Sequence, residues 1–396
     1  MDITIYPRKL SGTICAIPSK SQAHRVLICS AFSDNPVTII CPETNDDIEA
    51  TAGCLRALGA QISRTKDGYT VHPIKKIPPC AALDCRESGS TLRFMLPICA
   101  SIGVNTTFLM SGRLSQRPLS PLWEELERMG AKLSRPTKDT IQCQGRLQSG
   151  TYTMDGSISS QFITGLMFAL ALLPQQSQLT ITGQIESKPY IDMTENVLEA
   201  FGITSDDNCF GSQFHSPGCF TIEGDWSNAA FFLAAKVLGN PVTVSGLSLN
   251  SKQGDKAIYF LLESLCAPLS VCCKDIPDLV PILAVAAGAS NGGTFYNIGR
   301  LRLKESDRVA AVAEMLTTLG SKVTVDGDTM SVSPAAYAGG IIDAKNDHRI
   351  AMAAAIASTV SGAPITILGA ECVKKSYPDF WSEFTRLGGY YEQYIR

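Results

Sequence analysis

The stretch KNDHRIAMAAAIASTVSG, residues 345–362, places an alanine-rich apolar run directly after four polar or charged residues. The apolar run, which starts at Ile350, predicts a buried helix. Arg349 then falls in the first turn of this helix, where the helix dipole favours an anion over a cation. An arginine at this position therefore needs a reason of its own.

Composition limits the possible reasons. The chain has 396 residues, which predicts two or three domains, and its hydrophobic fraction of 45% is that of a globular protein. The formal net charge of −3 gives no indication of nucleic-acid binding. Its apolar runs are shorter than the roughly 18–20 residues of a membrane span, and MDITIYPRKL lacks the apolar segment of a secretory signal. We therefore expect a cytoplasmic protein.

The cysteines and histidines agree with this expectation. Fourteen cysteines without a secretory signal indicate reduced thiols in the cytosol. There is no C-x-x-C spacing and there are only four histidines, so the sequence predicts no metal site.

The pattern of residues 345–362 recurs along the chain. Polar stretches that precede apolar helical runs lie near residues 20, 89, 159, 225, 278 and 347, and short β-rich segments such as VTIIC and ITILG follow. A second predicted helix usually ends at a glycine, as in LWEELERMGA. Hairpin-like pairs such as KVTVDGDTMSVSP come next. The chain therefore repeats a unit of strands and two helices six times, and units of this length usually need their neighbours to fold.

The sixth repeat is incomplete, because only YYEQYIR follows its last glycine. The segment DITIYP at the other end of the chain can supply the missing strand. We therefore expect an α/β protein of α+β repeats with two domains of three repeats each. Residues 19–223 form one domain, and residues 1–18 plus 224–396 form a composite second domain. Chance alternation of helices and strands is the alternative, but matching helix ends in six repeats disfavour it.

The helix starts suggest what the cations do. Six N-termini that point to a common region concentrate positive potential, and further cations there indicate a strongly anionic ligand. Lys304 and Arg308 share a helix face if their segment is helical, or they form a solvated face with Glu305 and Asp307. The cations near predicted helix starts or in adjoining loops are Lys20, Arg25, Arg117, Lys304, Arg308, Arg349 and Lys375.

Candidate acid–base groups are fewer. Asp278 precedes a helix almost devoid of charge and can act as a base or as an N-cap. Glu305 lies between two cations, which depress its pKa unless burial or a ligand's charge opposes them. The residues Ser159, Ser160 and Gln161 at a helix start can cap the helix or hold a phosphate.

Nine segments between residues 18 and 380 together resemble the 5-enolpyruvylshikimate-3-phosphate synthase family of enolpyruvyl transferases. They are PSKSQAHR, SGSTLRF, QRPL, SISSQF, SKPYIDMT, IPDLVP, LRLKESDR, NDHRIAMA and KKSYPDF. Each segment alone is weak evidence, but nine in the family's order are strong evidence. The resemblance implies two domains of three βαβαββ units each, an inside-out α/β barrel, with the active site in the interdomain cleft.

The resemblance also implies a reaction. Shikimate 3-phosphate and phosphoenolpyruvate give 5-enolpyruvylshikimate 3-phosphate and phosphate, by addition and elimination without a covalent enzyme intermediate, cofactor or metal. The implied shikimate 3-phosphate site comprises Lys20, Ser21, Arg25, Ser159, Ser160, Gln161, Ser187, Asp278 and Lys304. The implied phosphoenolpyruvate site comprises Lys20, Gly89, Arg117, Gln161, Arg308, Arg349 and Lys375. These two small molecules are the expected partners of a monomeric enzyme.

Within these sites the resemblance implies individual roles. Ser21 and Arg25 hold the shikimate carboxylate, and Arg308 and Arg349 clamp the carboxylate of phosphoenolpyruvate, where planar guanidinium groups suit bidentate pairing. Binding of a substrate carboxylate would explain why Arg349 lies in the first turn of a helix. Asp278 is the expected base for the 5-hydroxyl, and either Glu305 or Lys20 delivers the proton to C3.

Some positions depart from the family pattern, and other functions are possible alternatives for a chain with these motifs. Glu87 stands where asparagine is usual and Ser90 where threonine is usual, and these changes bear on affinity for phosphoenolpyruvate and its mimics. Arg300 replaces a smaller polar residue found in some relatives and has no assigned role. The UDP-N-acetylglucosamine enolpyruvyl transferases carry a reactive cysteine in the loop that here reads SGRLSQRP, without cysteine. A silent anion-binding protein of the same fold is a second alternative. Nucleic-acid binding, as in distant cyclases of related repeat fold, is disfavoured by the acidic net charge.

Overall fold

The computed structural model describes residues 1–204, 209–211 and 213–394. The chain divides into two compact units: Pro18–Glu223, here the central unit, and Met1–Ile17 with Gly224–Arg396, here the composite unit. Pro18, expected in the composite domain, belongs to the central unit. The N–H of Ser19 donates to the carbonyl of Glu223 at 2.8 Å, whereas the N–H of Asp225 donates to the carbonyl of Ile17 at 2.8 Å.

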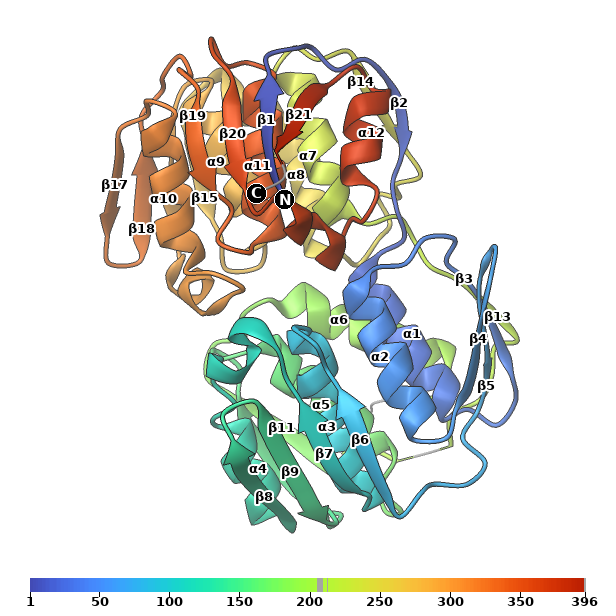
Figure 1. Cartoon of the computed structure of the whole chain (residues 1–396). Helices are drawn as coiled ribbons and strands as arrows, with labels where there is room; N and C mark the ends of the chain where they lie inside the picture. The colour runs from blue at the N-terminus through green and yellow to red at the C-terminus, as the bar shows by residue number, and fades with distance from the viewer. Residues whose placement is uncertain (205–208, 212, 395–396) are drawn as a thin grey trace. The chain divides into compact units, whose positions relative to one another are not determined.

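The central unit contains three sheets, in each of which the first two strands are parallel and the others antiparallel (Figure 1). The first sheet has the order β13 (Cys219–Thr221), β3 (Val37–Ile40), β5 (Gly68–His72) and β4 (Gln61–Thr65). The second has β6 (Cys80–Asp84), β7 (Asn105–Leu109), β9 (Thr140–Gly145) and β8 (Ala131–Thr137). The third has β10 (Thr151–Asp155), β11 (Ser177–Thr182) and β12 (Cys209–Phe210). A helix connects β6 to β7 and another connects β10 to β11, because a parallel pair needs a crossover, whereas β3 and β13 come from the two ends of the unit.

The composite unit also contains three sheets. One pairs β14 (Val242–Ser245) with β2 (Gly12–Cys15). Another has the order β15 (Leu269–Cys272), β16 (Gly293–Tyr296), β18 (Thr329–Val332) and β17 (Val323–Asp326). The last has β19 (Gly340–Asp343), β20 (Ile365–Leu368), β1 (Asp2–Tyr6) and β21 (Tyr390–Tyr394).

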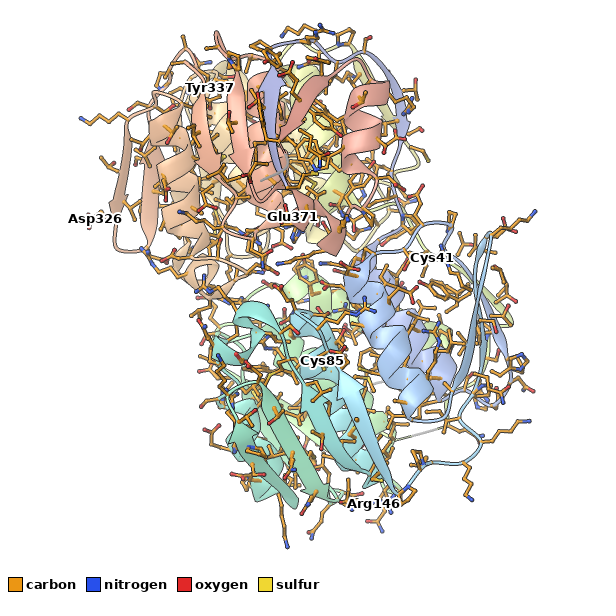
Figure 2. The ribbon with its side chains drawn as sticks, in the orientation of Figure 1. Cys41, Cys85, Arg146, Asp326, Tyr337 and Glu371 are labelled. Atoms are coloured by element: carbon orange, nitrogen blue, oxygen red, sulfur yellow. The ribbon has the colours of Figure 1, made fainter. Side chains whose placement is uncertain are left out.

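Strand β1 completes the last sheet. It pairs antiparallel with both β20 and β21, so the blue N-terminal strand lies between two red strands in Figure 1. The prediction that DITIYP supplies the missing strand is confirmed. The N-terminal amine of Met1 also donates to Oε2 of Glu371 at 2.6 Å, and Glu371 is labelled in Figure 2.

Six helices fill the two cores, three in each unit, and they begin where the polar stretches predict. They are α1 (Lys20–Ala31), α3 (Gly89–Ile102), α5 (Ser160–Ala171), α7 (Trp226–Val237), α9 (Val280–Gly288) and α11 (His348–Ser358). Every residue of α9 and of α11 is buried, which explains why their sequences lack a polar face. The hydroxyl of Tyr337, labelled in Figure 2, donates to the carbonyl of Val285 in α9 at 2.6 Å.

A second set of helices completes the repeats. It comprises α2 (Asp46–Ala57), α4 (Leu122–Arg128), α6 (Lys188–Ala200), α8 (Ile258–Glu263), α10 (Arg308–Thr318) and α12 (Phe380–Arg386). Short 3-10 helices are η1 (Gly112–Gln116), η2 (Gly254–Ala257), η3 (Ser264–Cys266), η4 (Gly299–Leu303) and η5 (Ala370–Lys375). Within the described ranges, no helix has the length and apolar character that crossing a membrane requires. The fold is mixed α/β, with repeated units in two domains, and each domain has its own hydrophobic core.

Candidate active site

The first turns of the buried helices carry many of the predicted site residues. The side chains of Ser19, Ser88, Ser159, Asp225 and Asp347 cap five of these helices by accepting a backbone N–H. Such caps satisfy donors that a helix cannot bond internally, and the remaining N–H groups of each first turn keep their positive potential.

In the central unit, Lys20 opens α1 and forms an ion pair with Asp47 of α2. The Nζ–Oδ2 distance is 2.9 Å, and the two side chains are only 16% and 15% exposed. A pair this sheltered holds the ammonium group in one place more firmly than an exposed pair would. No sequence pattern indicated Asp47, because nothing in the sequence links residues 27 positions apart.

Arg25 lies one helical turn after Ser21 and is 2% exposed. Its guanidinium group donates to the carbonyls of Ser21 at 2.7 Å and Tyr190 at 2.9 Å, and to the hydroxyl of Thr194 at 2.9 Å. Burial lowers the pKa of Arg25 to about 10. Among the described residues, no carboxylate lies within ion-pair distance of it. A buried cation with only neutral partners is suited to bind an anion.

Two further arginines converge on the start of α3. A β-carbon placed on Gly89 would lie 2.5 Å from Nη1 of Arg117 and 2.7 Å from Nη1 of Arg93. Arg93 also donates to the carbonyl of Pro118 at 3.1 Å. The Nε of Arg117 is buried without a hydrogen-bond partner in the described structure. Two guanidinium groups beside a helix N-terminus form a suitable place for a phosphate.

The starts of α5 and α6 add polar groups of the same unit. Nε2 of Gln161 donates to Oγ of Ser90 at 2.9 Å and thereby links α5 to α3. Ser160 is 4% exposed, and Ser187 occupies the N-cap position of α6 at φ 56° with 3% exposure. Ser159, as the N-cap of α5, is the remaining serine of the predicted phosphate site.

In the composite unit, Asp278 is the centre of a charged cluster. Its Oδ1 accepts from Nη1 of Arg308 at 2.8 Å, and its Oδ2 accepts from Nη2 of Arg349 at 2.9 Å. Nζ of Lys304 lies 3.4 Å from Oδ1. The alternative N-cap role of Asp278 is wrong, because Leu279 is the N-cap of α9 and no side chain caps that helix.

Arg308 corrects a second expectation. Lys304 is the C-cap residue that follows η4 and Arg308 begins α10, so the two do not share a helix face. The solvated-face alternative also fails for Arg308, which is 1% exposed and donates to Glu305 at 2.7 Å. Its Nε donates to the fully buried Asp347 at 2.9 Å. These carboxylates and burial act in opposite directions, and the carboxylates prevail, so the pKa of Arg308 is raised.

Lys375, the last residue of η5, contacts the segment that precedes α11, and Arg349 lies in the first turn of that helix. Nζ of Lys375 donates to the carbonyl of Asn346 at 2.7 Å, and Nη1 of Arg349 donates to the carbonyl of Ser227 at 3.5 Å. The hydrogen bonds of Arg349 thus join the N-terminal ends of α7, α9 and α11.

Burial lowers the pKa of Lys304, and the charges of Arg308 and Arg300 act in the same direction, while Asp278 opposes them.

Asp255 of η2 is another residue that no sequence pattern indicated. It is 2% exposed, and one carboxylate oxygen accepts from Oγ of Ser227. Burial, with the nearby charge of Asp278, raises the pKa of Asp255 to about 7. Asp347 was missed as well, although its place directly before an apolar helix is a recognisable N-cap signal.

Glu87, the departure from the family pattern, turns its carboxylate toward η1. A β-carbon on Gly112 would lie 2.5 Å from Cδ of Glu87. Its neighbour Arg86 pairs with Asp46 at 3.4 Å. Where the structure describes the chain, no group of three or more His, Cys, Asp or Glu side chains could hold a metal ion.

The predicted site residues are divided between the two units. The central unit contains Lys20, Ser21, Arg25, Gly89, Arg117, Ser159, Ser160, Gln161 and Ser187. The composite unit contains Asp278, Lys304, Glu305, Arg308, Arg349 and Lys375.

Comparison with known structures defines the class. The fold is similar to that of the enolpyruvyl transferase NikO from Streptomyces tendae, with a TM-score of 0.75 and 17% identity over 99% of this chain and 98% of that chain. It is also similar to an EPSP synthase from Acinetobacter baumannii, with a TM-score of 0.80 and 22% identity over 99% of this chain and all of the other. At these identities the likeness concerns the fold, which is that of the enolpyruvyl transferases.

Sequence comparison defines the family. The family model described as EPSP synthase (3-phosphoshikimate 1-carboxyvinyltransferase) matches residues 5–384. Relatives named 3-phosphoshikimate 1-carboxyvinyltransferase are 36% identical in Clostridium beijerinckii and 38% identical in Clostridium botulinum. The matches cover 99% and 98% of this chain and the same shares of those proteins. The chain belongs to the EPSP synthase family.

Proposed function

We propose that the protein carries out the reaction of its family. It transfers the enolpyruvyl group of phosphoenolpyruvate to the 5-hydroxyl of shikimate 3-phosphate and releases phosphate, a step of the shikimate pathway toward chorismate and the aromatic amino acids. Both substrates carry a phosphate and a carboxylate. The observation that supports this best is Arg25 of α1, a buried cation whose hydrogen bonds within the described structure go to neutral groups, in a helix whose sequence matches the family motif.

Shikimate 3-phosphate binds mainly to residues of the central unit. Ser21 and Arg25 hold its carboxylate, because a guanidinium pairs with a carboxylate in a planar, bidentate manner. Its phosphate binds to the hydroxyl and N–H groups at the starts of α5 and α6. The residues assigned to this substrate are Lys20, Ser21, Arg25, Ser159, Ser160, Gln161, Ser187, Asp278 and Lys304.

The residues assigned to phosphoenolpyruvate come from both units. Its phosphate lies at the start of α3, next to Gly89 and Arg117, and also engages Lys20, Gln161 and Lys375. Its carboxylate binds Arg349 and Arg308. In the structure Arg349 pairs with Asp278 at 2.9 Å, so the substrate carboxylate takes the place of Asp278 on this arginine. This exchange leaves Asp278 able to accept a proton.

The chemistry then follows from these positions. Asp278 accepts the proton of the 5-hydroxyl, whose oxygen attacks C2 of phosphoenolpyruvate, while Glu305 or Lys20 delivers a proton to C3. Loss of a proton from C3 and of phosphate from C2 restores the double bond. General acid–base groups contribute about 10²–10⁴-fold. Holding two anions in attack geometry contributes about 7–11 kcal/mol, so the clamp arginines matter as much as the base.

A phosphate-release assay tests this function. The wild-type protein should release phosphate from phosphoenolpyruvate with shikimate 3-phosphate as acceptor and not with UDP-N-acetylglucosamine. Turnover with UDP-N-acetylglucosamine would instead indicate a UDP-N-acetylglucosamine enolpyruvyl transferase. Tight binding of both substrates without phosphate release would identify the silent anion-binding protein.

The same proposal includes a cytoplasmic monomer that needs no cofactor and binds no nucleic acid. Thirteen cysteines of the described chain carry free thiols, in keeping with a reducing compartment. Size-exclusion chromatography with light scattering checks the monomer, and a phosphate-release assay in the presence of a chelator checks the independence from metal.

A further inference from the structure

A chain of buried hydrogen bonds links three helices of the central unit behind the candidate site. Nδ1 of His24 in α1 lies 2.7 Å from Oγ1 of Thr51 in α2. Oγ1 of Thr51 lies 2.7 Å from Oγ1 of Thr91 in α3. Oγ1 of Thr91 donates to Oγ of Ser88, the N-cap of α3, at 2.8 Å. All four side chains are at most 1% exposed, so water does not compete for these bonds.

The direction of the chain follows from its last bond. The single hydroxyl hydrogen of Thr91 is used on Ser88, so Thr91 accepts from Thr51. The hydrogen of Thr51 is then used as well, so Thr51 accepts from Nδ1–H of His24. His24 is therefore the tautomer that carries its hydrogen on Nδ1. Burial, with the charges of Lys20 and Arg25, lowers the pKa of His24 well below its usual value, so the imidazole stays neutral.

The bond between His24 and Thr51 is one of two links between α1 and α2, and the other is the ion pair of Lys20 with Asp47. Lys20 and His24 are four residues apart on α1, and their partners Asp47 and Thr51 are four residues apart on α2. Residues with this spacing lie on one face of a helix. The ion pair and the imidazole–hydroxyl bond thus hold the facing surfaces of α1 and α2 at two successive turns.

The other end of the chain reaches the candidate phosphoenolpyruvate site. Ser88 directly precedes Gly89, next to which the guanidinium group of Arg117 lies. The residue after Gly89 is Ser90, whose hydroxyl accepts a hydrogen bond from Gln161 at 2.9 Å. Ser88 fixes this turn through a cap bond from the N–H of Thr91 at 3.3 Å. A displacement of the first turn of α3 would move the N–H groups and Gly89 together.

A packing role accounts poorly for His24. Its Nε2 is buried without a hydrogen-bond partner in the described structure, which is a cost that an apolar side chain would avoid. The edge contact with Phe94, at 6.4 Å between ring centroids, could be made by an apolar residue as well. What an apolar residue cannot supply is the hydrogen on Nδ1 that starts the chain.

We propose that His24 is a positioning residue for phosphoenolpyruvate, which aligns the first turn of α3 with that of α1 through Thr51 and Thr91. The inference rests on the proposed function, because it takes the start of α3 as the phosphate site. Bound groups must be held within about 0.5 Å of productive geometry, so small displacements of this turn reduce binding.

Two substitutions of His24 separate positioning from packing. Asparagine can place its amide N–H near the position of Nδ1, whereas leucine fills the volume without a donor. We expect His24→Leu to raise KM for phosphoenolpyruvate about tenfold, and His24→Asn to stay within about threefold of wild type. The dissociation constant of shikimate 3-phosphate, measured by calorimetry, should change less than the KM for phosphoenolpyruvate in both. A near-normal leucine variant beside an impaired asparagine variant would show that His24 only packs, and would overturn the proposal.

Substitutions of Thr51 repeat the test without altering the histidine. Thr51→Val removes the relaying hydroxyl, and Thr51→Ser keeps it. Valine should raise KM for phosphoenolpyruvate and serine should not, and the double variant His24→Leu/Thr51→Val should be no worse than the poorer single variant. Multiplicative effects of the two substitutions would contradict a common chain. If the leucine variant does not fold, the Thr51 pair decides alone.

Thr106→Val is the matched control. Thr106 of β7 is another buried threonine of the central unit, 3% exposed and outside this chain, so its loss should leave KM unchanged. The proposed function fails separately, if the wild-type protein releases no phosphate. With an active wild type and unchanged KM in all His24 and Thr51 variants, only the positioning role is rejected.

Discussion

Arg349, in the first turn of α11, donates from Nη2 to Oδ2 of Asp278, which precedes α9, at 2.9 Å. The two residues are 71 positions apart, and their pairing joins the starts of two buried helices. The cation that is out of place with respect to one helix dipole thus has an anionic partner within the protein. In the proposed reaction, a substrate carboxylate replaces that partner.

Asp278→Asn tests the proposed base. The amide keeps the shape of the side chain but cannot accept the proton of the 5-hydroxyl. We expect kcat to fall at least about a hundredfold, with shikimate 3-phosphate still bound, in a steady-state phosphate-release assay. A kcat within tenfold of wild type would remove Asp278 from the role of base.

Arg349→Lys tests the carboxylate clamp. Lysine retains the charge but lacks the planar fork that pairs with two carboxylate oxygens. We expect kcat/KM for phosphoenolpyruvate to fall at least about tenfold, while binding of shikimate 3-phosphate stays near normal. Equal kinetics for lysine and arginine at this position would mean that only charge matters there.

Arg25→Met separates stability from function. Arg25 is 2% exposed and has neutral partners, and one of them, the carbonyl of Tyr190, also accepts from Thr194 at 2.8 Å. Removing a buried charge that lacks a counter-ion relieves a desolvation cost. The variant should unfold at or above the wild-type temperature in calorimetry, yet lose binding of shikimate 3-phosphate. Retained binding would refute the role of Arg25.

Gly89→Ala tests the close approach at the start of α3. The added methyl group would lie 2.5 Å from Nη1 of Arg117 and would push this guanidinium away. KM for phosphoenolpyruvate should rise several-fold, on the order of tenfold, with little change for shikimate 3-phosphate. Gly53→Ala in α2 is the control, because no atom other than those of its chain neighbours and of its own helix backbone lies within 4 Å of the added β-carbon. An equal rise of the KM for phosphoenolpyruvate in Gly89→Ala and Gly53→Ala would contradict the prediction.

Asp255 should make stability depend on pH. Its pKa is raised to about 7 in the folded protein, from an ordinary value near 4. The folded state therefore binds this proton more tightly than the unfolded state, and stability falls as pH rises between about 4 and 7. The loss from this group is at most about 4 kcal/mol. Urea unfolding at several pH values should show that Asp255→Asn reduces this decline; identical pH profiles would show that Asp255 titrates normally.

The sequence alone was enough to predict the repeats and the helices that line the candidate site. Buried helices are recognisable locally, because an apolar run and the polar N-cap before it are neighbours in the chain. Even the pairing of Asp2–Tyr6 with the C-terminal strand followed from sequence, since the last repeat lacked one strand.

Only the tertiary structure decided which charged groups meet. The pairs of Arg308 with Asp347 and of Lys20 with Asp47 join residues 39 and 27 positions apart, and the hydrogen-bond chain from His24 to Ser88 crosses three helices. No local pattern encodes such contacts. They depend on how neighbouring helices are rotated and shifted in the core, which packing of the whole unit determines.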